Sequence, residues 1–162
     1  MGGPQADFSS ATDISGEPLI VMANPMHRPT IVLADDHHGV LTVASMLVET
    51  EYHVVATVED AAAAVRAVAE LKPDVVVLDI GMPGTDGIQA ANQLRGLGNT
   101  AKVVFLTIKD DSDCIEAARA MGASYVLKAH MYSDLLTAIN EALAGRLFFS
   151  SPLHPLGYRN LS

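Results

Sequence analysis

The sequence has few of the features that would indicate secretion, a membrane or nucleic acid. It contains one cysteine, Cys114, so no internal disulfide can form and nothing requires an oxidising compartment. Only 10 Lys and Arg residues stand against 19 Asp and Glu, and the net charge of −9 would repel nucleic-acid phosphates. The N-terminus lacks the basic region of a signal peptide, and its longest apolar stretch, "PLIVMA", is too short to span a membrane. We therefore expect a cytoplasmic protein that does not enter a membrane or bind nucleic acid directly.

The chain does contain enough apolar material for one core. Its 162 residues are 49% apolar and 18% charged, which predicts a single globular domain. Residues 1–28 are rich in Gly, Pro, Ser and polar residues, a composition typical of a poorly ordered extension. We expect the folded domain at residues 29–150 and a C-terminal tail at residues 151–162.

Short β-branched runs alternate with segments of helical period. Near-continuous apolar strands are expected when helices cover both faces of a parallel sheet. The pattern predicts an α/β fold, a doubly wound (βα)5 sheet of five parallel strands with helices on both faces. The strands are expected at residues 30–35, 53–58, 74–79, 102–107 and 124–128, and the last three helices near 88–97, 113–121 and 133–144.

Polar side chains follow four of the five predicted strands at their carboxyl ends, the edge where such sheets bind ligands. Asp35 and Asp36 follow the first strand, Asp79 the third, Thr107 ends the fourth and Lys128 the fifth. Three neighbouring carboxylates would repel one another unless a cation neutralised them, and Mg²⁺ prefers oxygen ligands. We therefore predict a Mg²⁺ site that could also hold a phosphoryl group. Asp79 would be the nucleophile, Lys128 would stabilise phosphoryl charge, and Thr107 would hydrogen-bond the new phosphate.

These stretches resemble the receiver domain of two-component response regulators, from residue 29 to about residue 150. "LADDHH" is similar to the acidic pair of that family and "LDIGMPGTDG" to its phosphoacceptor loop. "LT" at residues 106–107 is similar to the threonine or serine that ends its fourth strand, and "GASYVLK" to its final strand. "DDHH" and "AINEALAGRLFFSS" are most similar to the NarL-type subfamily. The resemblance implies a flavodoxin-like fold.

The resemblance also implies a role for each acidic residue of the site. Asp79 would accept the phosphoryl group from a histidine kinase or a phosphotransfer protein. Asp35, Asp36 and Asp79 would hold Mg²⁺ together with the backbone carbonyl of Gly81. The protein would not be an enzyme beyond Mg²⁺-dependent self-phosphorylation and autodephosphorylation.

A switch is implied as well. Thr107 and Lys128 would bind the phosphoryl group, and Tyr125 matches the aromatic residue that moves inward when the threonine is drawn toward the phosphate. The surface that changes would comprise the helices predicted at 113–121 and 133–144 and the strand between them. Homodimers would form through that surface, or through the first and last helices.

Three positions differ from the common pattern of the family. Ala129 follows Lys128 where many receivers have a proline after a cis bond, and a cis bond before alanine costs about 3–4 kcal/mol. Ile108 follows Thr107 where a small residue is common, so it would narrow access to the phosphoryl group. Gly81 offers the site no side chain. These differences motivate an alternative function, a phosphorylation-independent interaction module.

Further alternatives remain. NarL-type proteins usually continue into a helix-turn-helix domain, and residues 151–162 are too few for its three helices, so the chain could be the receiver half of a transcription regulator. An aspartyl phosphatase would need a second aspartate where Gly81 stands, and a flavin phosphate would meet two carboxylates in the first loop. His37 and His38 could suggest a transition-metal site, but adjacent residues on a helix do not share a face, so we expect none.

Overall fold

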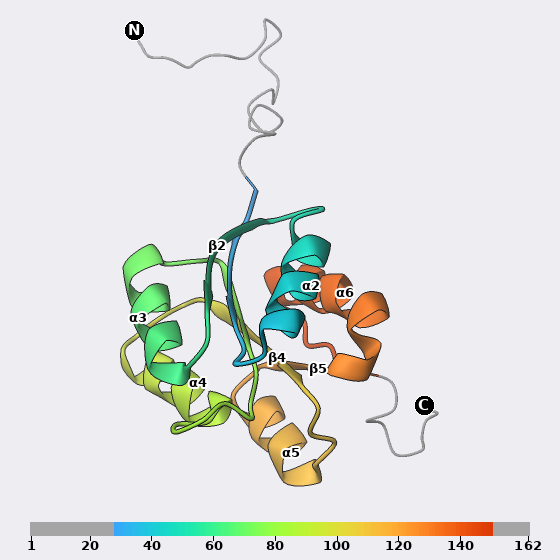
Figure 1. The fold of residues 1–162 in the computed structure, drawn as a ribbon. Helices are drawn as coiled ribbons and strands as arrows, with labels where there is room; N and C mark the ends of the chain where they lie inside the picture. Colours follow the sequence, from blue (N-terminus) through green and yellow to red (C-terminus); the bar gives the residue numbers. More distant parts are fainter. Residues whose placement is uncertain (1–27, 151–162) are drawn as a thin grey trace, which may run out of the picture.

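The computed structural model describes residues 28–150 (Figure 1). The predicted N-terminal extension, apart from Arg28, and the predicted C-terminal tail lie outside the described residues. No helix within the described range is long and apolar enough to cross a membrane.

One parallel sheet forms the centre of the fold. Its strands lie in the order β2-β1-β3-β4-β5, which is the order of a flavodoxin-like doubly wound sheet. The predicted fold class and the five predicted strands are therefore confirmed. The strands are β1 (Thr30–Ala34), β2 (His53–Val58), β3 (Val75–Leu78), β4 (Lys102–Thr107) and β5 (Ser124–Leu127).

Helices cover both faces of this sheet. In Figure 1, α2 and α6 lie together on one side, and α3 and α4 lie together on the other. A 3-10 turn, η1 (Lys128–His130), precedes α6, so the last helical segment begins before the predicted residue 133. The helices are α2 (His38–Val48), α3 (Ala61–Leu71), α4 (Gly87–Gly96), α5 (Ser112–Ala120) and α6 (Met131–Leu143).

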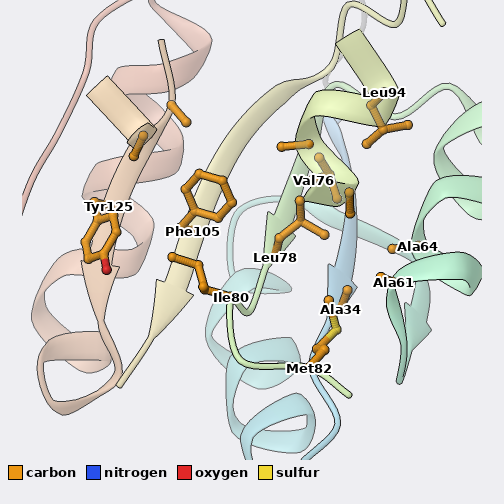
Figure 2. Packing of buried hydrophobic residues seen from close by; sticks show 14 of the residues in the cluster. Ala34, Ala61, Ala64, Val76, Leu78, Ile80, Met82, Leu94, Phe105 and Tyr125 are labelled. Atoms are coloured by element: carbon orange, nitrogen blue, oxygen red, sulfur yellow. The ribbon is translucent and has the colours of Figure 1, made fainter. Parts of the chain in front are cut away.

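Alternate side chains of each strand enter two separate apolar clusters. In β1, Val32 packs with α3 and α4, whereas its neighbour Leu33 packs with α2 and α6. Every residue of β3 is buried, because this strand lies in the middle of the sheet with helices on both faces. Figure 2 shows Val76 and Leu78 of β3 in the first cluster, with Phe105 and Tyr125 on the following strands. The strand that leads to Asp79 is thus held on all sides.

A short segment after α6 extends the sheet at β5, which the sequence analysis did not predict. Tyr125 N donates to Phe148 O (2.9 Å), and Ser150 N donates to Tyr125 O (3.0 Å). The Phe149 ring stacks on the Tyr125 ring with centroids 6.4 Å apart, and the Arg119 guanidinium lies 4.4 Å above Phe149. Residues 148–150 therefore cover the edge of β5 and contact the proposed switch residue directly.

Candidate functional site

Asp79 lies at the end of the central strand and is buried. Its backbone N–H donates to Ala34 O (3.0 Å), which continues the pairing of β3 with β1. Its Oδ1 atom accepts a hydrogen bond from Gly81 N (3.1 Å), which fixes the carboxylate against its own loop. The loop then returns to the strand end, where Gly87 N donates to Ile80 O (3.0 Å). Backbone contacts on both sides thus set the position of this carboxylate.

Gly87 permits this return because it has no side chain. A Cβ atom at position 87 would lie 2.3 Å from the carbonyl oxygen of Asp79 and 3.0 Å from the Cα of Ile80. Asp86 is the N-cap of α4 and forms a capping box with Gln89, which anchors the helix start beside Asp79. The first turn of α4 and the Asp79 loop are therefore packed backbone against backbone.

The lysine after β5 reaches the two buried aspartates. Lys128 Nζ lies 2.7 Å from Asp35 Oδ2 and 3.3 Å from Asp79 Oδ2. The side chain of Lys128 is 11% exposed, and those of its two partners are 3% and 4% exposed. The structure contains no cis peptide bond among residues 28–150, so the Lys128–Ala129 bond is trans. A proline is therefore not needed to bring this ammonium group to the carboxylates.

The two adjacent histidines point to different partners. His37 is the N-cap residue of α2 and not a residue of the helix, and its ring makes no capping hydrogen bond. Its Nδ1 atom lies 3.3 Å from Asp35 Oδ1 and 3.3 Å from Asp36 Oδ1. His38 Nε2 instead lies 2.9 Å from a carboxylate oxygen of Glu59. His37 therefore does not share the helix with His38, and its ring joins the acidic cluster.

Thr107 and Tyr125 meet the same backbone segment from two sides. Both residues are fully buried. Thr107 Oγ1 accepts from Lys109 N (3.1 Å), and the Tyr125 hydroxyl donates to Lys109 O (2.8 Å). Burial raises the pKa of Tyr125, and the neighbouring Cys114 and Asp111 raise that pKa further, so the hydroxyl remains a donor. The Tyr125 ring therefore lies inward, linked to Thr107 through residue 109.

Sequence reasoning missed Lys109. The signal that points to it is its position two residues after Thr107, at the same edge of the sheet. Lys109 lines a cavity of about 390 Å³ at this edge. Ile108, which is 78% exposed, lines the same cavity. The cavity is lined by His37, Val40, Asp79, Gly81, Ile108, Lys109 and Lys128.

The donor atoms around this cavity fit a divalent cation. One ligand atom from each of Asp35, Asp36, His37 and Asp79 lies within 4.8 Å of the others. Asp36 Oδ1 is buried and accepts no hydrogen bond from any residue in the range 28–150. Asp35 Oδ2 is buried as well and forms the 2.7 Å ion pair with the Lys128 ammonium group. The unpartnered oxygen of Asp36, beside two further carboxylates, is a suitable ligand for Mg²⁺.

The strand order and the acidic edge define a class of protein, the flavodoxin-like receiver domains. A sequence profile of the response regulator receiver domain matches residues 31–140 of this chain. The chain belongs to that family and is a receiver domain of the NarL type. Response regulators are in general signal transducers and not enzymes, and receiver domains bind Mg²⁺ at their acidic pocket.

Individual relatives agree with this assignment. The chain is 29% identical to the nitrate/nitrite response regulator protein NarL of Escherichia coli (strain K12), over 78% of this chain and 60% of that protein. It is 35% identical to the transcriptional regulatory protein DegU of Brevibacillus brevis, over 81% of this chain and 55% of that protein. The crystal structure of a LuxR-family two-component response regulator from Aurantimonas sp. SI85-9A1 matches with a TM-score of 0.74 and 35% identity, covering 78% and 93% of the two chains. The chain thus spans little more than half the length of the NarL and DegU proteins.

Proposed function

We propose that the protein is a phosphorylation-controlled switch. Asp79 accepts a phosphoryl group from a histidine kinase or a phosphotransfer protein in a Mg²⁺-dependent reaction, and the surface of α5, β5 and α6 changes its partners. The observation that supports this best is the position of Asp79. Its carboxylate is buried at the end of the central strand, 3.3 Å from an ammonium group and within 4.8 Å of the other groups of the acidic cluster.

The chemistry follows from these groups. The phosphoryl donor is a phosphorylated histidine of the kinase or phosphotransfer protein. An Asp79 carboxylate oxygen forms a bond to phosphorus while the bond between phosphorus and the histidine nitrogen breaks. The electron pair of that bond stays on the imidazole, which then takes a proton. Asp35, Asp36 and Asp79 would hold Mg²⁺ with the Gly81 carbonyl, and the bound ion would neutralise charge on the phosphoryl oxygens. Lys128 supplies the second positive charge.

The signal would leave the site through residue 109. A phosphoryl oxygen that accepts from the Thr107 hydroxyl would draw this side chain toward Asp79 and away from Lys109 N, which donates to Thr107 Oγ1. The segment that then moves carries the carbonyl partner of Tyr125. Tyr125 belongs to β5 and contacts residues 148–150, so its environment changes with that segment. We propose homodimerisation through the α5-β5-α6 surface or through α2 and α6 as the output.

The location and the wider setting are part of the proposal. We propose a cytoplasmic protein, with transcription control as the output only where the receiver is joined to a DNA-binding domain in a longer protein. The net charge of −9 would repel nucleic-acid phosphates, which argues against direct nucleic-acid contact by the receiver itself.

Mass spectrometry after treatment with acetyl phosphate and Mg²⁺ tests this function. The intact protein is expected to gain the mass of one phosphoryl group, and Asp79→Asn is expected to gain none, because an amide is not a nucleophile here. Asp110→Asn is the matched control, since Asp110 is an exposed aspartate in the loop after Thr107. An Asp79→Asn protein that is phosphorylated like the wild type would overturn the proposal.

One observation favours the interaction module as a second candidate. Tyr125 is buried and its hydroxyl donates to Lys109 O, so protein groups alone can hold the ring inward. Partner binding or dimerisation that is equal in the wild type, in Asp79→Asn and in Mg²⁺-free buffer would support this module over the switch.

Ile108 is expected to slow small phosphodonors. Its exposed side chain stands at the cavity opening, so Ile108→Ala is expected to raise the rate of phosphorylation by acetyl phosphate about threefold, equivalent to about 0.7 kcal/mol of activation free energy. Leu97→Ala is the control, because Leu97 is a similarly exposed apolar residue that follows α4 and does not line this cavity. Equal rates for wild type and Ile108→Ala would show that Ile108 does not restrict access.

A further inference from the structure

His37 is the one nitrogen donor in the acidic cluster formed by Asp35, Asp36, His37 and Asp79. Its ring is 68% exposed, so packing does not hold it in place. As the N-cap residue of α2 it could be expected to turn toward the free N–H groups of the helix, but it makes no such bond. The ring nitrogen faces the carboxylates instead.

His37 Nδ1 lies close to carboxylate oxygens of two aspartates, as ligands of one metal ion do. Nδ1 lies at the same distance, 3.3 Å, from Asp35 Oδ1 and from Asp36 Oδ1. The contact with Asp36 lacks hydrogen-bond geometry, and Asp36 Oδ1 has no other partner among residues 28–150. Asp35 Oδ1 accepts from the backbone N–H of His37 at 2.9 Å and is also hydrogen-bonded to Nδ1 at 3.3 Å. That hydrogen bond accounts for the contact with Asp35 but not for the equally short approach to Asp36 Oδ1, whereas a cation between Nδ1 and the two carboxylates would account for both.

We propose that His37 is a metal ligand, and that it makes this site prefer a divalent first-row transition-metal ion such as Mn²⁺ over Mg²⁺. This inference rests on the proposed function for the location of the metal. Mg²⁺ takes oxygen ligands and keeps its waters, so it gains little from an imidazole. Transition-metal ions bind imidazole well and tolerate a mixed nitrogen and oxygen set. His37 Nδ1 would add one nitrogen ligand to the carboxylate oxygens of Asp35, Asp36 and Asp79.

The neighbouring histidine provides the matched control. His37→Asn removes the imidazole and keeps a side chain favoured at helix N-caps, so α2 is expected to remain intact. His38→Asn removes an imidazole one residue away that contacts Glu59 and not the cluster. Circular dichroism and thermal melting of all three full-length proteins check that each variant folds.

Calorimetric titration with MnCl₂ and with MgCl₂ gives the ratio of the two affinities for each protein. That ratio is expected to fall at least about tenfold in His37→Asn and to stay at the wild-type value in His38→Asn. Electron spin-echo envelope modulation of the Mn²⁺-bound proteins is expected to show nitrogen coupling in the wild type and His38→Asn, and none in His37→Asn.

Several results would overturn the assignment. A wild-type protein without nitrogen coupling, or a His37→Asn protein with the wild-type affinity ratio, contradicts it directly. Equal losses of Mn²⁺ and Mg²⁺ affinity in His37→Asn would show that His37 only positions the carboxylates and is not a ligand. If the wild type is phosphorylated with Mg²⁺ but shows no nitrogen coupling, this inference fails and the proposed function stands. If neither ion binds, the Mg²⁺ dependence of that function fails too.

Discussion

Gly87→Ala is expected to lower the free energy of unfolding by about 3 kcal/mol, because its new methyl group has no space. The Cβ atom would lie 2.3 Å from the Asp79 carbonyl oxygen and 2.9 Å from the carbonyl carbon. Both are backbone atoms of the central part of the sheet, so no flexible side chain can move aside. The first turn of α4 or the Asp79 loop must shift, and urea denaturation measures the cost.

The same shift is expected to impair phosphorylation. The atoms that must move belong to Asp79, and a displacement of about 1 Å at a reacting group can lower a rate by roughly 10²-fold. Phosphorylation by acetyl phosphate, measured on the folded fraction of Gly87→Ala, is therefore expected to be much slower than in the wild type. This separates loss of geometry from loss of folded protein.

Gly96→Ala is the control for both measurements. Gly96 lies at the other end of α4, and a Cβ atom there would meet no atom within 4 Å. Alanine is a better helix former than glycine, so this variant is expected to gain up to about 1 kcal/mol and to keep the wild-type phosphorylation rate. Equal stabilities for the two alanine variants would contradict the close approach between α4 and the Asp79 loop.

The sheet and its functional edge were predictable because both depend on simple patterns. The run from Val75 to Leu78 is apolar at every position, which is typical of a strand covered on both faces, and it ends directly at Asp79. Parallel strands present their carboxyl ends at one edge, so the acidic residues and Lys128 could be placed together without knowing any contact. Strand spacing and connection rules were sufficient for that step.

Features that depend on a single residue's position or on packing were not predictable. The helix start at His38 makes His37 an N-cap residue, and this one-residue difference turns its ring toward the carboxylates. Lys109 links Thr107 and Tyr125 through backbone atoms, which leave no signature in the side-chain pattern.

The contacts of Gly87 and of residues 148–150 belong to the same group. Several glycines follow Asp79, and the sequence does not distinguish Gly87, where a Cβ atom has no space, from Gly84, where the positive φ of 78° is the constraint. The segment at residues 148–150 pairs with β5 over too few residues to produce a strand pattern. These features require the tertiary structure.

Lys128→Met is expected to lower the free energy of unfolding by about 3–5 kcal/mol in metal-free buffer. Methionine keeps the apolar length of the side chain but removes the ammonium group that lies 2.7 Å from Asp35 and 3.3 Å from Asp79. Two buried carboxylates then lack this counter-charge. Chemical denaturation with EDTA present measures the loss, and Asp35→Asn in the same background is expected to recover part of it.

Mg²⁺ is expected to stabilise Lys128→Met more than the wild type, because the ion and the ammonium group neutralise the same carboxylates. Denaturation curves with increasing Mg²⁺ test this, since ligand binding to the folded state alone adds to its stability. Lys109→Met is the control, because Lys109 lines the same cavity but forms no ion pair among the described residues. Equal Mg²⁺ stabilisation of wild type and Lys128→Met would show that the two cations act on separate charges.

Phosphorylation of Lys128→Met is expected to slow by roughly 10²–10³-fold even at saturating Mg²⁺. The metal ion can replace the lysine in neutralising the buried carboxylates, but it cannot replace the lysine in binding the phosphoryl oxygens.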